Sequence, residues 1–277
     1  MVPMGRARRN RIHARLQGGL GNQLFIWAAG FSLAARIDGI LTLDDALIPK
    51  LNRNRRLDRR KFELDYFNLR RSAMPSWMRN SWEVFFEEGF DYDSRFTTIE
   101  SSVVLHGYFQ SWRYMDGQQQ RIQEFLLDNA RYSESLNAIT RELGNDPWVG
   151  VHVRRGDYLR VGVLNIVGRD YYAEAIPAAL AQSGAERFIV FSDDICLARE
   201  VVPGAARYIG GENLQSPADT LMLLSKAAAF VGANSSFSWW AAFLNKDPKA
   251  FKVFPKQWFS DSSVTCPDLL VESWRRL

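Results

Sequence analysis

The sequence predicts an α/β fold in which parallel sheets are wrapped by helices. From about residue 148 onward, short apolar runs alternate with longer amphipathic segments, the pattern of strands connected through helices. The first half opens in the same order, with an apolar run, a glycine-rich turn and a long amphipathic segment. With 277 residues, 47% of them hydrophobic, the chain is large enough for two domains.

In the first half, we expect a strand over residues 11–16, a helix from about 22 to 36 and a second strand near 40–43. Residues 50–100 are rich in arginine and aromatic side chains without a clear period, so loops and irregular helices are expected there. A further strand is expected near 103–106.

The second half is expected to alternate strands and helices throughout. The expected strands are 148–152, 187–191, 206–209, 228–232 and 250–254, and the expected helices are 171–182, 195–202, 217–226 and 237–244. Asn145-Asp146-Pro147 consists of residues typical of turns and marks the expected boundary between two domains. This gives an N-terminal domain over 1–145 and a C-terminal domain over 146–277, whose last residues could pack back on the first domain.

Composition excludes several classes of protein. The net charge of +4 is spread over 35 basic and 31 acidic residues, which does not indicate nucleic-acid binding. Cys196 and Cys266 are too few and too far apart for a disulfide framework or a zinc cluster. The basic N-terminus lacks the apolar stretch of a signal peptide or membrane anchor. We expect a cytoplasmic enzyme whose basic patches could contact the inner membrane surface.

Three of the expected strands end in polar clusters. They are His152 to Tyr158, Ser192 to Asp194 and Ala233 to Trp239. In open α/β sheets, ligands bind beyond the carboxyl ends of the strands, where loops lead into helix N-termini. If these strands are parallel, all three clusters line one crevice.

The first cluster contains two adjacent arginines, which are planar, always charged groups suited to phosphate. Because strand side chains alternate, Arg154 shares a face with His152, and Arg155 shares the other face with Val153. One of the two arginines should therefore face a ligand. The alternative is a surface or structural arginine pair that forms a salt bridge with Asp157.

The other two clusters also allow two interpretations each. Asn234, Ser235 and Ser236 before Phe237 suit a plain helix cap equally well as an anion site at the helix N-terminus. Asp193 and Asp194 could form a metal pair, cap a helix, or accept hydrogen bonds from a ribose or a guanine. A metal site is not expected, because no further clustered carboxylates or histidines complete a coordination sphere.

The glycine-rich turn over residues 18–23 resembles a dinucleotide fingerprint weakly and lacks the Gly-Lys-Ser/Thr of a P-loop. Gly19 and Gly21 would permit close approach of a backbone or a ligand, with Asn22 beside them. A tight turn from strand to helix without any ligand accounts for the glycines equally well.

Five motifs in sequence carry a family resemblance. They are GGLGNQLF at 18–25, HGYFQSW at 106–112, HVRRGDY at 152–158, FSDD at 191–194 and ANSSFSWWAAFLN at 233–245. Together they resemble the α-1,2-fucosyltransferases of glycosyltransferase family 11. The resemblance implies a GT-B architecture, in which two Rossmann-like, doubly wound domains face each other across a cleft. The N-terminal half would take the acceptor and the C-terminal half the nucleotide.

The resemblance also implies the reaction. L-Fucose would pass with inversion from GDP-β-L-fucose to a hydroxyl, usually the 2-OH of a terminal β-galactoside, with no obligatory divalent ion or other cofactor. The partners implied are therefore GDP-fucose and a galactoside-containing glycan, while the oligomeric state is not predicted.

Residue roles follow from the matching motif positions. Arg154 resembles the clamp on the β-phosphate, with His152 its neighbour in the donor site, and Arg155 is a weaker candidate. By the same resemblance, the remaining donor contacts are Asp193 or Asp194 with guanine or ribose, Ser235 and Ser236 with the phosphates, and Asn22 closing over the diphosphate and fucose. Residues 195–198 depart from the family pattern, where a more polar stretch with tryptophan is usual.

A carboxylate is the conventional base for the acceptor hydroxyl, and Asp157 is the candidate; orienting an arginine or capping the next segment is its alternative role.

A run of basic residues in the first half could suit an acidic or lipid-linked glycan, although a solvated basic face is the favoured interpretation. The run comprises Arg53, Arg55, Arg56, Arg59, Arg60 and Lys61.

Two competing functions remain. The donor could be another GDP-deoxyhexose such as GDP-colitose. A non-catalytic sugar-nucleotide or glycan-binding module is disfavoured, because it would be expected to lack the phosphate-facing arginine, whereas Arg154 and the serine run are present.

Overall fold

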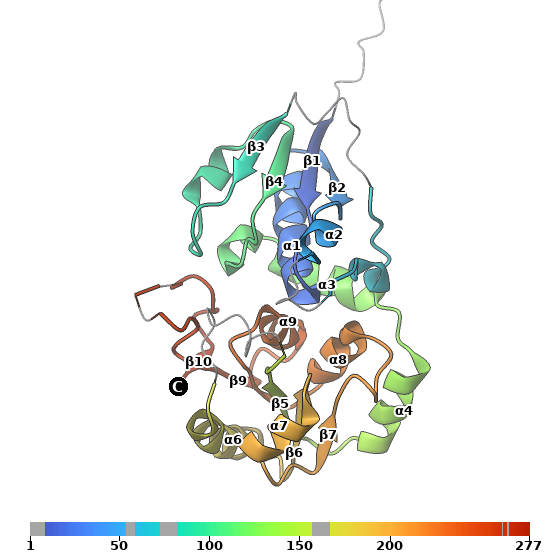
Figure 1. Cartoon of the computed structure of the whole chain (residues 1–277), viewed down its shortest axis with the longest axis vertical. Coiled ribbons are helices and arrows are strands. Elements are labelled where there is room, and N and C mark those ends of the chain that lie inside the picture. The colour runs from blue at the N-terminus through green and yellow to red at the C-terminus, as the bar shows by residue number, and fades with distance from the viewer. Residues whose placement is uncertain (1–8, 54–58, 73–81, 157–166, 262, 265) are drawn as a thin grey trace, which may run out of the picture.

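The computed structural model describes residues 9–53, 59–72, 82–156, 167–261, 263–264 and 266–277. The described residues form two parallel sheets, one in each half of the chain, with helices α1 (Leu20–Arg36) and α9 (Ser236–Leu244) meeting between them (Figure 1). Within these ranges, no helix is long and apolar enough to cross a bilayer.

The first sheet has four strands in the order β2-β1-β4-β3. Its strands are β1 (Asn10–Arg15), β2 (Gly39–Asp44), β3 (Glu83–Phe86) and β4 (Val103–His106). The helices of this half are α1, α2 (Ile48–Leu51), α3 (Gln119–Asn129) and α4 (Glu134–Leu143), with short 3-10 helices at Leu64–Phe67, Ser94–Thr98 and Trp112–Met115.

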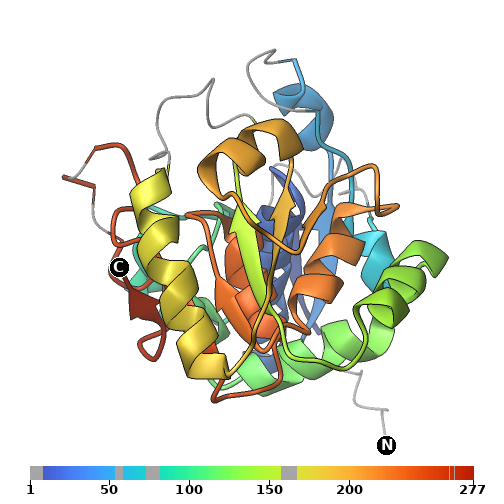
Figure 2. The same cartoon turned by 90° about the horizontal axis from the view of Figure 1, so that it is seen from below.

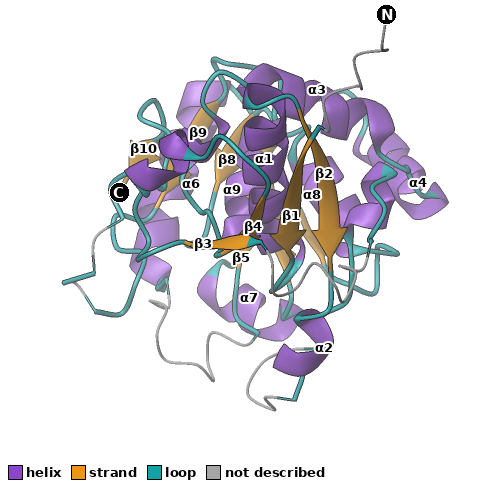
Figure 3. Cartoon of the chain, turned by 90° about the horizontal axis from the view of Figure 1, so that it is seen from above, coloured by secondary structure: helices purple, strands orange, loops and turns teal. Residues whose placement is uncertain are grey.

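Alternation along β1 decides what each face of the first sheet carries. Ile12 and Ala14 are buried in the main core beside α1, which lies along β1 and β2 (Figure 3). His13 and Arg15 therefore lie on the opposite face. There the buried apolar contact is a small one, in which Val104 packs with Trp82 and Val84.

The second sheet has six strands in the order β10-β9-β8-β5-β6-β7. They are β5 (Val149–Val153), β6 (Phe188–Ser192), β7 (Arg207–Ile209), β8 (Ala229–Val231), β9 (Phe251–Phe254) and β10 (Arg275–Arg276). Its helices are α6 (Arg169–Ser183), α7 (Ile195–Val201), α8 (Pro217–Leu224) and α9. Helix α6 packs on one face and α8 and α9 lie on the other, so the sheet is doubly wound (Figure 2).

One hydrophobic cluster runs through both halves of the chain. Phe25 on α1 contacts two tryptophans of α9, with ring centroids 4.6 Å from Trp239 and 5.3 Å from Trp240. Gln123 on α3 also donates a hydrogen bond to the carbonyl oxygen of Phe243 at 2.7 Å. The two halves are therefore joined by a packed interface as well as by the chain itself.

The expected parallel α/β fold is found, and every expected strand and helix of the second half overlaps an observed one. The sequence predictions lacked β3, α3, α4 and β10. The sequence left open that the last residues pack back on the N-terminal domain; in the structure, Arg275 and Arg276 extend the second sheet by pairing with β9. The contact with the first half is made earlier, where Asp268 accepts a hydrogen bond from Arg113 at 3.2 Å.

Candidate functional site

The N-termini of α1 and α9 meet at one point, each directly beyond the carboxyl end of a strand. A Cβ atom added to Gly21 would lie 2.6 Å from the backbone nitrogen of Phe237 and 2.6 Å from the carbonyl carbon of Ser236. Because those atoms belong to the backbone, they cannot move aside as the tip of a side chain can. Gly21 is thus required for the close approach of the two helix starts.

Asn22 links three segments at this junction. Its Oδ1 accepts hydrogen bonds from Ser236 Oγ at 2.6 Å and from Gln110 Nε2 at 2.7 Å. Gln110 follows β4, so one amide ties together α1, α9 and the loop after β4. The sequence motifs at 18–25, 106–112 and 233–245 therefore meet in space.

Gln23 fastens a distant segment to the glycine turn. Its side chain is fully buried, and its Nε2 donates to the carbonyl oxygens of Gly18 at 3.0 Å and Lys61 at 2.7 Å. Its Oε1 accepts from the backbone N–H of Glu63 at 3.0 Å. Residues 61–63 consequently run beside the start of α1.

This fastening brings Arg60 to the glycine turn. Arg60 Nη1 lies 3.2 Å from where a Cβ of Gly19 would be, and Gly19 is the N-cap residue of α1. The half-buried guanidinium therefore stands at a helix N-terminus, whereas the neighbouring Arg59 is exposed. The sequence interpretation of the whole basic run as a solvated face does not describe Arg60.

His152, at the carboxyl end of β5, is 5% exposed and faces α9. Its Nδ1 lies 2.6 Å from Ser238 Oγ, which itself accepts a hydrogen bond from the backbone of Ala233 at 3.1 Å. With its oxygen used as an acceptor, the Ser238 hydroxyl can donate to Nδ1, which puts the imidazole proton on Nε2. Burial, helped by the charge of Arg154, lowers the pKa of His152 to about 3, so the ring is neutral.

The adjacent arginines point to opposite sides, as strand alternation predicts. Arg154 Nη1 lies 2.6 Å from Asp193 Oδ2, and its side chain is 17% exposed. Arg155 is 4% exposed, and its Nη2 donates to the carbonyl oxygen of Val167 at 3.0 Å. The guanidinium of Arg155 is thus inside the protein, on the α6 side, and away from α9.

The two aspartates also have different partners. Asp193 joins the two arginines, because its Oδ1 accepts the backbone N–H of Arg155 at 2.9 Å while Oδ2 pairs with Arg154. Asp194 is the N-cap of α7, and its Oδ1 accepts the backbone N–H of Leu197 at 3.0 Å. Among the expected alternatives for this pair, the helix cap is the one found for Asp194.

The serine run begins α9. Ser235 is the N-cap, and its Oγ accepts the backbone N–H of Phe237 at 3.2 Å. Asn234 is buried, and its amide donates to the carbonyl oxygen of Trp258 at 2.6 Å. The ring of Phe237 lies against His152, with centroids 5.1 Å apart. Asn234 thus fixes a neighbouring loop, while Ser235 and Phe237 shape the start of the helix.

Asp157, the candidate base, lies outside the described residues, as do Arg55 and Arg56. In the described part of the chain, no three His, Cys, Asp or Glu side chains gather as a metal ion would require.

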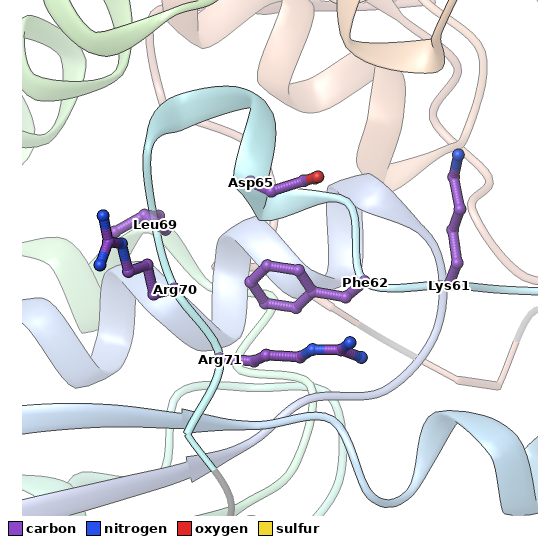
Figure 4. A pocket seen from close by; sticks show the side chains of 6 residues that line it. All are labelled: Lys61, Phe62, Asp65, Leu69, Arg70 and Arg71. Atoms are coloured by element: carbon purple, nitrogen blue, oxygen red, sulfur yellow. The ribbon is translucent and has the colours of Figure 1, made fainter.

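A hollow of about 370 Å³ lies elsewhere, on the first half of the chain. It is lined by Lys61, Phe62, Asp65, Leu69, Arg70 and Arg71. Figure 4 shows Phe62 between Asp65 and Arg71, with Arg70 and Lys61 at opposite sides. Arg71 pairs with Asp45 at 2.7 Å. Arg154 does not line this hollow, so the polar junction of α1, α9 and β5 is the stronger candidate site.

Comparison with known proteins assigns the chain to a family. The sequence model "Glycosyl transferase family 11" matches residues 5–275. The O-antigen biosynthesis glycosyltransferase WbnK of Escherichia coli is 27% identical over 96% of this chain and 100% of that protein. An α-1,2-colitosyltransferase of Escherichia coli is 28% identical over 96% of this chain and 98% of its own length.

A mouse protein, galactoside 2-α-L-fucosyltransferase Sec1, is 30% identical over 87% of this chain and 66% of its own length. Among solved structures, the fucosyltransferase NodZ from Bradyrhizobium superposes with a TM-score of 0.51 at 13% identity, over 86% of this chain and 94% of NodZ. The two halves, each built on a parallel sheet with helices, have the GT-B fold, which confirms the expected fold class. The chain belongs to glycosyltransferase family 11.

Proposed function

We propose that this protein transfers L-fucose from GDP-fucose to the 2-OH of a β-galactoside, with inversion at the fucose carbon. The family match covers nearly the whole chain, and one relative bears the name galactoside 2-α-L-fucosyltransferase. The proposed division of labour assigns GDP to the half over 146–277 and the acceptor to the half over 1–145.

The observation that carries the proposal is the placement of Arg154. Its guanidinium follows the carboxyl end of β5, on the face that His152 shares with the start of α9. A doubly wound sheet binds ligands at this edge, next to the point where the strand order reverses, and here β5 has β6 on one side and β8 on the other. A diphosphate at this point would meet a fixed cation and a helix N-terminus together.

Cleavage of the fucosyl bond develops negative charge on the leaving diphosphate and positive charge on the sugar. Donors that are already in position stabilise that negative charge without reorganising. In our proposal Arg154 and the first-turn N–H groups of α9 supply them. The ion pair with Asp193 holds Arg154 before the nucleotide arrives, and the diphosphate then competes for the same guanidinium.

The other residues proposed to bind GDP-fucose would lie around Arg154. Asn22 and Ser236, joined by a hydrogen bond of 2.6 Å, would border the diphosphate and fucose from the two helix starts. Asp157 remains the proposed base for the acceptor hydroxyl, with the orientation of an arginine as its alternative role. An unchanged pH profile of kcat in Asp157→Asn would exclude the role of base.

A second donor has a specific observation in its favour. The relative named α-1,2-colitosyltransferase aligns with 96% of this chain at 28% identity. Colitose is also carried on GDP, so the same diphosphate clamp would serve. The choice between the two sugars depends on contacts to the deoxyhexose ring.

The test is a transfer assay in EDTA with GDP-fucose, a panel of β-galactosides and GDP-colitose as a competing donor, followed by NMR assignment of the product linkage. The proposal predicts α-1,2-fucosylated galactoside. Transfer of colitose in preference to fucose would replace the proposed donor. Activity that appears only when a divalent ion is restored would overturn the metal-independent clamp.

A further inference from the structure

The first sheet carries a row of polar and aromatic side chains at its carboxyl edge. The parallel register pairs Phe86 on β3 with His106 on β4, and Arg15 on β1 with Asp44 on β2. Ala14 pairs with Leu105, which places Arg15 beside His106. Laterally paired residues of a parallel sheet point to the same face, so these four side chains form one row across β3, β4, β1 and β2.

The row lies on the face opposite α1. Ile12, Ala14 and Leu105, which alternate with members of the row or their neighbours, belong to the core on the α1 side. The row is also at a distinctive place in the topology. The chain runs from β1 outward to β2 and later returns to β4 on the other side of β1. Such a reversal opens a crevice at the carboxyl ends of the two strands.

The chemistry of the row suits a neutral, hydroxyl-rich ring. Phe86 is 55% exposed, and its ring centroid lies 5.0 Å from that of His106. Arg15 Nη1 lies 3.5 Å from His106 Nδ1. Because an arginine can only donate, Nδ1 is the acceptor and Nε2 of the neutral ring carries the proton. Burial, aided by the charge of Arg15, lowers the pKa of His106, so the ring is neutral at pH 7.

Asp44 anchors the far end of the row. Its Oδ1 accepts the backbone N–H of Ala46 at 3.0 Å, and its Oδ2 lies 3.3 Å from His13 Nε2. Burial acts to raise the pKa of Asp44, but these two hydrogen bonds, together with electrostatic attraction from His13 and Arg15, outweigh burial and lower that pKa. The fixed carboxylate beside Arg15 balances the charge of the guanidinium, which favours a neutral ligand over an anionic one.

A half-buried carboxylate holds the loop after β4 in place. Glu87 Oε2 accepts the backbone N–H groups of Tyr108 and Phe109, both at 2.7 Å. Phe109 has a φ of +53°, a strained conformation for a bulky residue. Such strain persists only where the surroundings enforce it, and it concentrates at functional sites.

The loop connects the row to the proposed donor site. Gln17 Nε2 donates to the carbonyl oxygen of Gly107 at 3.1 Å, which ties the loop after β1 to the loop after β4. Gln110, at the end of the same loop, donates to Asn22, which accepts from Ser236 as well. The path from the row to the start of α9 is therefore a chain of direct hydrogen bonds and short backbone.

We propose that this row binds the acceptor hexose, an inference that rests on the proposed function. The apolar C–H face of the pyranose packs on the exposed ring of Phe86, which removes both surfaces from water. Arg15 and the Nε2–H of His106 donate hydrogen bonds to the ring hydroxyls, while the charge of Asp44 balances that of Arg15. An aromatic wall with a few fixed polar groups is the usual composition of a small-ligand site.

The test separates acceptor binding from donor binding. Parent, Phe86→Ala, Phe86→Tyr and His106→Ala are assayed with GDP-fucose and methyl β-D-galactopyranoside, and the dissociation constant of GDP is measured by calorimetry for each. Tyr132→Ala is the matched control, because Tyr132 is 41% exposed but lies over Lys226, away from the row. Melting temperatures show that each variant folds.

Phe86→Ala should raise the acceptor KM by about tenfold or more, the size expected for the loss of one apolar contact in a binding site. Its GDP dissociation constant should stay at the parental value, Phe86→Tyr should restore the acceptor KM, and Tyr132→Ala should match the parent. If the acceptor KM of Phe86→Ala is unchanged while the parent still transfers fucose, the row does not bind the acceptor, and the proposed function still holds. If the parent binds GDP but fucosylates no galactoside, the proposed function itself fails.

Discussion

Neighbouring residues of one type can have opposite roles, and the arginine pair after β5 shows why. Arg154, which alternation puts on the same side as His152, pairs with Asp193 at 2.6 Å, whereas Arg155 donates to the carbonyl oxygen of Val167, just before α6. Alternation predicted that they would separate, but only the placement of α6 and α9 decides which side can meet a ligand. In the described structure, Arg155 Nη1 has no hydrogen-bond partner.

Arg154→Ala should lower kcat by about 10²-fold or more, the usual cost of removing a positioned donor to a developing anion. Arg155→Met keeps the length of the side chain while removing a buried charge with an unpaired nitrogen, so it should keep or raise the melting temperature and change kcat far less. Steady-state kinetics and thermal melts check both. Equal losses of kcat in the two variants would contradict the separation of roles.

The buried imidazole of His152 makes the free energy of unfolding depend on pH. Its pKa is about 3 in the folded chain against 6.5 for the free side chain, chiefly through burial. Between these values the unfolded chain binds a proton that the folded chain does not. Stability is therefore fully present above about pH 6.5 and falls as the pH drops, by up to about 1.4 kcal/mol per unit.

His152→Asn keeps a hydrogen-bonding group for Ser238 but cannot be protonated. The difference in melting temperature between pH 7 and pH 4 should therefore be smaller in His152→Asn than in the parent. The half-buried carboxyls of Glu63 and Glu87, whose pKa values desolvation raises, act in the opposite direction but equally in both proteins. If the melting temperature falls equally in both proteins between pH 7 and pH 4, His152 is not the group responsible for the pH dependence.

At the scale of elements, the strands and helices follow from sequence patterns where the side chains alternate cleanly. Strand β3 escaped prediction because Phe86 is an exposed aromatic where alternation calls for a polar residue. Helix α4 had a readable signal, with Ser133 capping its start and Leu136, Ile139 and Leu143 buried at helical spacing.

Strand β10 could not be predicted, because Arg275 and Arg276 carry no apolar pattern. It forms because the C-terminal backbone pairs with β9, where the N–H of Leu277 donates to the carbonyl oxygen of Phe254 at 3.0 Å.

The contacts between distant segments at the candidate site could not be predicted from the sequence either. The motif residues could be listed from the sequence, but the contact of Arg60 with Gly19 and that of Gln110 with Asn22 join segments far apart in the chain.

The junction of helices α1 and α9 gives a prediction with a matched control. Gly21→Ala should cost about 1–3 kcal/mol, because the added methyl group would overlap the backbone of residues 236 and 237. At Gly30→Ala, on the same helix, the close overlap is with the tip of the Leu41 side chain, which can rotate away, and the Cβ of Ala14 lies at an ordinary contact distance of 3.6 Å. Denaturant melts and GDP binding should show a marked loss for Gly21→Ala and a small change for Gly30→Ala. Equal losses would refute the helix-start contact.

At the scale of the molecule, the two sheets share one hydrophobic core. Phe25, Trp239 and Trp240 connect the halves, together with the hydrogen bond of Tyr66 to Asp219 at 2.9 Å. A shared core of this kind makes the halves stabilise each other. The proposed donor site lies at this junction and thus depends on both.

Calorimetry should accordingly show one unfolding transition with equal calorimetric and van't Hoff enthalpies. GDP at about 100 times its dissociation constant should shift this transition upward as a whole, adding about 2.7 kcal/mol. Two resolved transitions, of which GDP moves only one, would contradict the shared core.

We propose that Arg154 and the start of α9 hold the diphosphate of a guanosine nucleotide. A crystal structure of the protein with GDP would test this binding mode. We predict β-phosphate oxygens about 3 Å from the Arg154 guanidinium and beside Ser235 and Ser236. GDP bound at another place, with Arg154 still paired to Asp193, would contradict the claim.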